Sequence, residues 1–397
     1  KQLFPFLLTL LMSMVATKSS AHDIAVDYNG TTIYYVWTNN NTELAVSYRG
    51  DTPSSYSNEY YGGIIIPNSV DYNGQLYSVT SIAQSAFEEC GLTSITIPSS
   101  VKTLEQGAFY GCSFLSSVNI PEGVTKIGLG AFSKCSRLTS ITIPSSVTII
   151  EKYAFDKCTS LNLIVSERTQ PISIDKSVFE TYDNPYNVYS MAMLIVPEGS
   201  ISAYQSATSW KNFSNISVAS EHKVKSIHVT KAGTSADYIS EWEKHLIEEL
   251  KISGELNGDD FAFFRGIRKL KVLDMSGTNI VAGGCYYEDT SGSFTDDEEN
   301  EYYYLEYDNC IPSDLFNGFK FESIIIPNSV TSIGSGAFAN CDNLTNIAFE
   351  SGNTYYDSRN NCNAIIETNT NTIIDGCKNS IIPNSITSIG NKAFYGL

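Results

Sequence analysis

Apolar positions recur along this chain in a pattern that repeats every 23 residues. Each unit carries the pattern L-x-x-I-x-I followed by Pro, and the apolar pairs end at Ile97, Ile120 and Ile143. The last two apolar residues alternate with period two, which predicts a short strand, and Pro ends the strand because it has no N–H for a ladder hydrogen bond. A single unit is too small to bury its own apolar side. We therefore expect the units to stack with parallel strands and to share one continuous core.

A second pattern, Ala-Phe-x-x-Cys, follows the predicted strands at nearly the same period. It predicts a short helical turn, and stacking would place equivalent side chains of neighbouring units about 5 Å apart. The predicted structural ladder consists of Phe87, Cys90, Phe109, Cys112, Phe132, Cys135, Phe155, Cys158, Phe338 and Cys341. Neighbouring ladder cysteines would lie within disulfide reach. Because a buried cysteine in a repeat is usually a small apolar filler, we expect the ladder thiols to stay reduced.

The pattern resumes with interruptions in the second half of the chain. The stretch that begins at Leu270 reads L-x-x-L-x-M-x-x-T-x-I, and the apolar pattern returns at Phe321. The 51 residues between these two positions are either two periods plus five residues or one period plus an insertion of 28. The insertion would fall at about 282–309. Two apolar runs within 360–378 flank a turn and predict a second insertion in the form of a hairpin.

The first 21 residues are expected to be a secretory signal peptide. A basic residue, Lys1, precedes an apolar run too short to span a bilayer, and small residues follow at Ser19–Ala21. Further along, Ser240 and Glu243 form a capping box that predicts a short helix over 240–250. The predicted organisation is a signal peptide at 1–21, a β-rich N-terminal cap at 22–62, a first array with its closing segment at 63–218, a linker at 219–237 and a second array at 238–397.

The unit LTSITIPSSVKTLEQGAFYGC, from Leu92 to Cys112, resembles the BspA-type leucine-rich repeats of bacterial surface and secreted proteins. The unit SIIIPNSVTSIGSGAFANC, from Ser323 to Cys341, resembles them equally. The resemblance implies a leucine-rich-repeat solenoid, mostly β with short helical turns, with parallel strands stacked in two arrays with caps. It also implies an exported, often adhesive protein without catalytic residues. The acidic insertion and the stretch around 247–275 depart from the family's pattern, since the latter lacks the Pro and the Ala-Phe-x-x-Cys turn.

The charge of the chain narrows the classes of partner. The formal net charge is −18, and a surface of this sign repels phosphate backbones and anionic lipid headgroups. We therefore expect no nucleic-acid partner. No stretch after the signal peptide reaches transmembrane length, so we expect no membrane insertion.

Candidate chemistry is sparse. The chain has no G-x-S-x-G motif, and its four histidines have no partner at zinc-ligand spacing, so we expect no enzyme activity, no metal site and no cofactor. The acidic run 296–299, with Glu301, is either a solvated charge run or a set of oxygen ligands for Ca²⁺. Two cysteine pairs flank the insertions, and a disulfide staple stays open for each: Cys285 with Cys310, and Cys362 with Cys377.

Two surfaces are candidates for partner contact. Strand alternation places Thr96, Asn119 and Thr142 outward and in register from unit to unit. The long insertion is rich in tyrosine, a residue that gives large contact area at low entropy cost. The tyrosines proposed for binding are Tyr286, Tyr287, Tyr302, Tyr303 and Tyr304.

These patterns predict a secreted or surface-displayed, non-catalytic binding protein. Its expected partners are host or bacterial surface proteins, or glycans. The alternative is a structural spacer or scaffold module for a region beyond the C-terminus.

Overall fold

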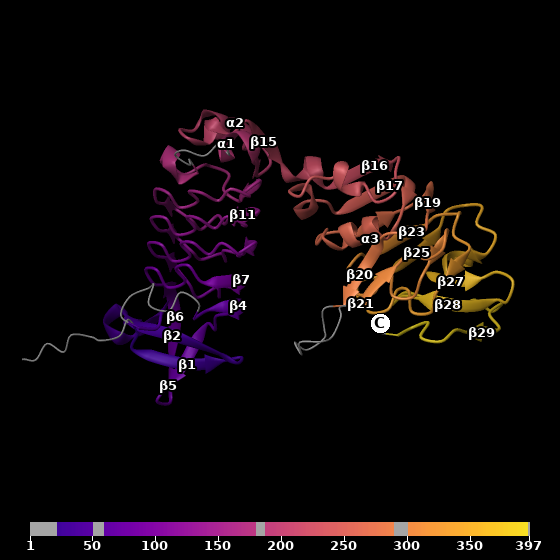
Figure 1. Cartoon of the computed structure of the whole chain (residues 1–397), viewed down its shortest axis with the longest axis horizontal. Helices are drawn as coiled ribbons and strands as arrows, with labels where there is room; N and C mark the ends of the chain where they lie inside the picture. Colours follow the sequence, from indigo (N-terminus) through magenta and orange to yellow (C-terminus); the bar gives the residue numbers. More distant parts are fainter. Residues whose placement is uncertain (1–21, 51–58, 180–186, 290–300, 396–397) are drawn as a thin grey trace, which may run out of the picture. The chain divides into compact units, whose positions relative to one another are not determined.

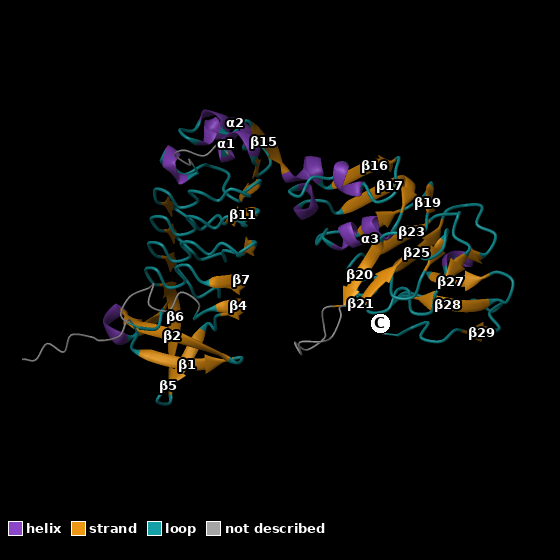
Figure 2. Ribbon diagram, in the orientation of Figure 1, coloured by secondary structure: helices purple, strands orange, loops and turns teal. Residues whose placement is uncertain are grey.

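A computed structural model describes residues 22–50, 59–179, 187–289 and 301–395. It comprises two compact units, Lys1–Ile216 and Ser217–Leu397. In both units most strands are short and pair in parallel with the equivalent strands of neighbouring coils, while helices are few (Figure 1, Figure 2). The predicted leucine-rich-repeat solenoid is therefore confirmed. The predicted signal peptide lies outside the described residues.

The first unit begins with an antiparallel cap. Asn29 and Gly30 form the turn of the first hairpin, with φ of 50° and 80°, a left-handed conformation that suits these two residue types. The cap continues without a break into the coils, because β3 pairs in parallel with the first coil strand, β6. The elements are β1 (Ile24–Tyr28), β2 (Thr31–Thr38), η1 (Asn39–Asn41), β3 (Glu43–Ser47), β5 (Ser69–Tyr72) and β6 (Gln75–Ile82).

Each later coil of the first unit contributes one strand to each of two sheets. The L-x-x-I-x-I segments form β4 (Tyr61–Ile65), β7 (Gly91–Thr96), β9 (Ser117–Val118), β11 (Ser140–Ile143), β13 (Leu163–Ser166) and β14 (Met193–Val196). The second apolar stretch of each unit forms β8 (Thr103–Leu104), β10 (Lys126–Ile127) and β12 (Ile149–Ile150). Ser140 pairs with Ser117 on one side and with Leu163 on the other, which confirms the parallel stacking and the period of 23.

The Ala-Phe-x-x-Cys segments form consecutive tight turns. Gly107 and Gly130 have φ of 61° at the equivalent position of neighbouring coils, and this left-handed conformation interrupts any longer helix. The Phe109 N–H donates to the Ala131 carbonyl oxygen at 2.7 Å, and the Phe132 N–H donates to that of Ala154 at 2.8 Å. The turns thus add a third column of hydrogen bonds between coils.

Aromatic side chains close the far end of the first unit. Trp210 is buried, and its indole N–H donates to the Ile172 carbonyl oxygen at 2.7 Å. Tyr204 is buried as well, and its hydroxyl lies 2.6 Å from the Ser166 hydroxyl. The elements of this closing segment are η3 (Lys176–Val178), α1 (Val188–Met191), α2 (Ile201–Ser206), η4 (Trp210–Asn212) and β15 (Asn215–Val218).

The second unit is built on a parallel sheet whose first strand lies in the segment predicted as a linker. The prediction of a linker at 219–237 is wrong, because β16 pairs with β17 over six residues and buries Ile227 and Val229. β18 pairs directly with β23, so the chain inserts 28 residues into a single period. The elements are η5 (Ala219–His222), β16 (Val224–Val229), η6 (Ser235–Asp237), β17 (Glu249–Leu256), β18 (Val272–Asp274), β19 (Thr278–Ile280), β23 (Ser323–Ile326) and β25 (Asn346–Phe349).

Helices in the second unit differ from the prediction. The helix expected over 240–250 is a single turn, η7 (Glu243–His245), because the chain enters strand β17 at Glu249. Its predicted capping residue is in place, since the Ser240 N–H and hydroxyl both donate to the Glu243 carboxylate at 2.8 Å. The longest helix, α3 (Gly258–Arg265), was not predicted and begins with an Asn257–Asp260 capping box.

Both insertions of the second unit contain antiparallel strands. The predicted hairpin at 360–378 is confirmed by the pairing of β27 with β28. In the longer insertion β20 pairs antiparallel with β21. The remaining elements are β20 (Cys285–Asp289), β21 (Glu301–Tyr304), β22 (Cys310–Ile311), β24 (Ser332–Ile333), β26 (Tyr356–Asp357), η8 (Arg359–Asn361), β27 (Ala364–Glu367), β28 (Thr372–Gly376) and β29 (Ser388–Ile389). In the part of the chain that the structure describes, no helix has the length and apolarity that crossing a membrane requires.

Candidate binding surface

A stack of phenylalanine rings forms the rigid centre of the first unit. Successive rings of Phe87, Phe109, Phe132, Phe155 and Phe179 lie 5.0–5.5 Å apart between centroids and within 9° of parallel. All five side chains are fully buried. Such offset contacts hold each coil in one position relative to the next, so side chains on the outer faces keep a fixed spacing.

The ladder cysteines serve this packing as hydrogen-bonded thiols. Cys112 donates its S–H to the Phe87 carbonyl oxygen at 2.9 Å, Cys135 to that of Phe109 at 3.2 Å, and Cys158 to that of Phe132 at 3.1 Å. Cys341 makes the same contact to Phe316 at 3.1 Å in the second unit. Burial raises the pKa of Cys90 and of Cys341 to about 12, so these thiols are protonated and poor nucleophiles at neutral pH.

One sheet of the first unit presents polar side chains outward in register. Thr96 and Asn119 are exposed and form a parallel bridge, and Thr142 is half-buried one coil further along. The alternating residues Ile95, Val118 and Ile141 point inward and are buried. Figure 1 shows β4, β7 and β11 following one another along one side of the stack.

The same row extends onto apolar residues that sequence reasoning missed. Ile65 on β4 pairs with Thr96 and is 51% exposed, and Tyr61 at the start of β4 is 80% exposed. The run of two glycines after Tyr61 hid this strand from the repeat pattern, although the Ile-Pro that follows at Ile66–Pro67 carries the signal. We define the strand face as Tyr61, Ile65, Thr96, Asn119 and Thr142.

The tyrosine-rich insertion is only partly a surface. The expectation that Tyr286 contacts a partner is wrong, because its side chain is buried in the core of the second unit and its hydroxyl donates to the Ser313 carbonyl oxygen at 3.2 Å. Tyr303 and Tyr304 on β21 are exposed. The side chains of Tyr287 and Tyr302 lie outside the described part of the chain.

Other candidate chemistry does not gather into a site. Among the described residues no three His, Cys, Asp or Glu side chains are grouped to hold a metal ion. The acidic run 296–299 lies outside the described residues. Cys310 is a thiol, so the staple to Cys285 is not formed, and Cys362 and Cys377 each donate to a backbone carbonyl oxygen instead of joining each other.

The repeat motif decides the family. The model of the BspA type leucine-rich repeat region matches residues 80–190 and 309–395, in six copies. The chain belongs to the BspA-type leucine-rich repeat family. The matched residues include the ladder from Phe87 to Phe179 in the first unit and Phe338 with Cys341 in the second.

Solved structures of similar proteins are bacterial. A leucine-rich cell surface protein from Faecalibacterium prausnitzii is 22% identical over 94% of this chain and 86% of that chain, with a TM-score of 0.34. A leucine-rich repeat protein from Bacteroides capillosus is 30% identical over 36% of this chain and 99% of that chain, with a TM-score of 0.30. TM-scores this low establish no shared arrangement, and the family assignment rests on the repeat motif. No curated protein matches the chain.

Proposed function

We propose that this BspA-type repeat protein is secreted or displayed at the bacterial surface and binds an extracellular protein or glycan without catalysis. The strand face is the proposed contact surface. Repeat solenoids of this kind offer extended binding surfaces, and the family membership supports that role for this chain. The single observation that carries the proposal is the exposed, in-register row from Ile65 through Thr96 and Asn119 to Thr142.

The chemistry of the strand face suits recognition. The backbone N–H and C=O groups of the strands are engaged in the parallel sheet, so the side chains carry the available donors and acceptors. Two hydroxyls and one amide provide hydrogen bonds at fixed spacing. Tyr61 and Ile65 add a large apolar contact at one end, where an aromatic anchor contributes most to binding.

Binding of the chain 22–397 to extracellular-matrix proteins and to a glycan array tests the proposal. In one variant Thr96→Lys and Asn119→Lys are combined, which puts two long charged side chains on the strand face. In the matched control Thr125→Lys and Thr148→Lys are combined, at exposed positions next to the short strands β10 and β12 of the other sheet. We expect the first variant to weaken binding at least about tenfold and the control to bind like the wild type.

The two variants carry the same added charge, so a purely electrostatic effect would weaken or strengthen both alike. Equal affinities for the two variants would rule out the strand face. A folded chain that binds nothing across both panels would favour the spacer role instead.

A further inference from the structure

The second unit contains a pocket of about 390 Å³ that the strand face does not include. It lies where strand β25 ends and the chain turns into β26 and η8. This volume falls at the lower end of the range for small-molecule sites, about 300–1,000 Å³. The residues that carry the argument are Asn346, Phe349, Asp357, Arg359 and Asn361.

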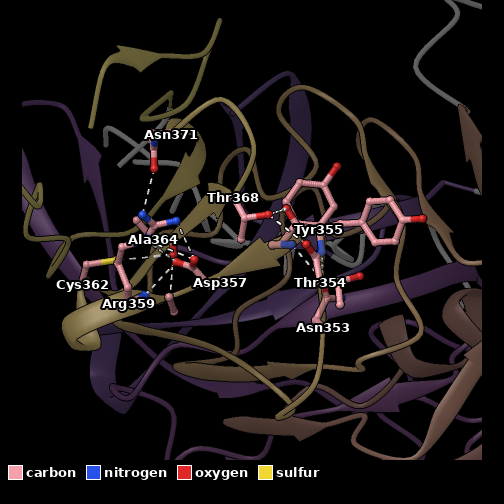
Figure 3. A network of polar contacts seen from close by, with 11 residues as sticks. Asn353, Thr354, Tyr355, Asp357, Arg359, Cys362, Ala364, Thr368 and Asn371 are labelled. Atoms are coloured by element: carbon pink, nitrogen blue, oxygen red, sulfur yellow. Dashed lines mark hydrogen bonds and ion pairs between the residues drawn. The ribbon is translucent and has the colours of Figure 1, made fainter. Parts of the chain in front are cut away.

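An ion pair forms a rigid polar wall of the pocket. The Arg359 Nε donates to the Asp357 carboxylate at 2.9 and 3.1 Å, and Nη2 donates to it at 2.7 Å. Nη1 donates to the Asn371 side-chain oxygen at 2.8 Å, which ties the guanidinium to the hairpin (Figure 3). Within the described part of the chain, two of the five guanidinium N–H groups make no hydrogen bond, so they can serve a ligand.

Amide groups and an aromatic ring complete the pocket. Asn346 and Asn361 are exposed at its rim, and the Asn346 side-chain N–H donates to the Ser323 hydroxyl at 2.9 Å, which leaves the carbonyl oxygen for a ligand. The half-buried ring of Phe349 lies on Tyr356, with centroids 6.0 Å apart and planes within 17° of parallel. The pocket therefore combines one apolar surface with several fixed donors and acceptors.

The charges of the pocket select a neutral ligand. Asp357 neutralises Arg359 within the wall, and Glu350, the other carboxylate of the lining, leaves a local excess of negative charge. An anionic ligand would be repelled, and no unpaired cation is present in the lining to hold it. A sugar ring fits these requirements, because neighbouring hydroxyls match planar amide and guanidinium groups and its C–H face packs on an aromatic ring.

We propose that this pocket binds a neutral pyranose ring, through the Asp357–Arg359 pair, the Asn346 and Asn361 amides and the Phe349 ring. The inference deepens the proposed binding function by naming a glycan ligand, but it does not depend on the strand face. A single small site of this kind binds one sugar ring weakly, in the millimolar range.

Saturation-transfer NMR on the chain 22–397 tests the pocket with methyl glycosides of glucose, galactose, mannose and N-acetylglucosamine, and with a methyl sialoside as the anionic probe. We expect saturable binding of at least one neutral glycoside and none of the sialoside. Asn361→Ala removes an exposed amide and should weaken binding about fivefold. Asn369→Ala removes an exposed asparagine near the turn between β27 and β28, outside the pocket, and should leave binding unchanged.

Three outcomes would overturn the pocket proposal. They are no saturable binding of any neutral glycoside to the folded chain, equal effects of Asn361→Ala and Asn369→Ala, and preferential binding of the sialoside. If the pocket fails in this way while the strand-face variant still loses a protein partner, the proposed function stands without the sugar site. If the pocket binds sugar and the strand face binds nothing, the reverse holds.

Discussion

At the scale of single residues, one aromatic position in each repeat fixes how the coils of the first unit stack. The five-ring column starts beside Tyr60, whose ring centroid lies 4.7 Å from that of Phe87. It ends on Phe179, which meets Trp210 and Phe213 edge to face. Every interior ring contacts two others, so removing one ring from the middle breaks two contacts and leaves a cavity that the stiff coils on either side cannot fill.

Phe132→Ala, at the centre of this column, should lower the free energy of unfolding by about 3–5 kcal/mol, the usual cost of deleting a buried ring. Phe114→Ala serves as the control. Phe114 is 49% exposed, and only Arg137 lies over its ring, so its loss should cost less than about 1 kcal/mol. Urea unfolding followed by circular dichroism measures both. Similar costs for the two variants would contradict a stabilising role for the column.

The sequence predicted these ladder residues because their spacing is written directly in the repeat. It did not predict the burial of Tyr286, because that depends on a tertiary neighbour. Arg265 on α3 donates to the Tyr286 carbonyl oxygen at 3.3 Å and so holds β20 against the helix. Composition favours an exposed tyrosine in a polar insertion, and only the packing of β20 on α3 reverses it.

At the scale of elements, the hairpin β27–β28 changes how neighbouring coils are joined. Phe316 donates its N–H to the Ala337 carbonyl oxygen at 3.0 Å, as the repeat requires. The next equivalent residue, Phe338, donates instead to the Asp375 carboxylate at 3.2 Å, and Gly376 continues the column to Ala393 at 2.8 Å. The end of the hairpin is thus spliced between two coils, and a buried carboxylate replaces a backbone acceptor.

Burial raises the pKa of Asp375 to about 7, although the N–H groups of Phe338 and Gly376 oppose the shift. The folded chain therefore holds this proton up to a higher pH than the unfolded chain does. The resulting stabilisation is fully present below pH 4 and is lost as the pH rises towards 7. It amounts to at most on the order of 4 kcal/mol.

Asp375→Asn should flatten this decline in the free energy of unfolding between pH 4 and pH 7. Asp342→Asn is the matched control, because Lys320 lowers the pKa of this exposed acid and so keeps its titration below the window. Glu59, whose pKa burial also raises to about 7, contributes its own slope equally to every variant. Thermal unfolding across the pH range checks the difference, and identical slopes for wild type and Asp375→Asn would refute it.

Two elements escaped sequence reasoning although their signals are present. Strand β16 reads V-x-x-I-x-V from Val224 to Val229, which is the repeat pattern with valine in place of leucine and isoleucine. Helix α3 follows an Asn-x-x-Asp capping box and buries Phe261 and Phe264 three residues apart. Both lack the Pro and the Ala-Phe-x-x-Cys turn that define the other units. By contrast, the sequence alone left the size of the first insertion open, because only the pairing of β18 with β23 distinguishes the two counts.

At the scale of the whole molecule, the sequence predicted the repeat type and period, because these are properties of spacing. The pocket beside η8 could not be predicted, because it exists only where the hairpin displaces the regular coil. Net charge is the property of the whole chain that bears on both proposed surfaces. The chain has 43 acidic and 25 basic residues, so its field repels polyanions at distances of the order of the Debye length, about 8 Å at physiological salt.

We expect the chain 22–397 to pass through a heparin column unretained at neutral pH and physiological salt, and to bind an anion-exchange resin until the salt is raised. Heparin carries sulfate and carboxylate groups on sugar rings, so the comparison separates recognition of the ring from recognition of its charge. Retention on heparin would reveal a basic patch that outweighs the net charge of −18, and the preference for neutral glycans would then be wrong. Absence of retention, together with saturable binding of a neutral glycoside, would place the selectivity in uncharged hydrogen bonds and ring packing, as the pocket around Arg359 and Phe349 requires.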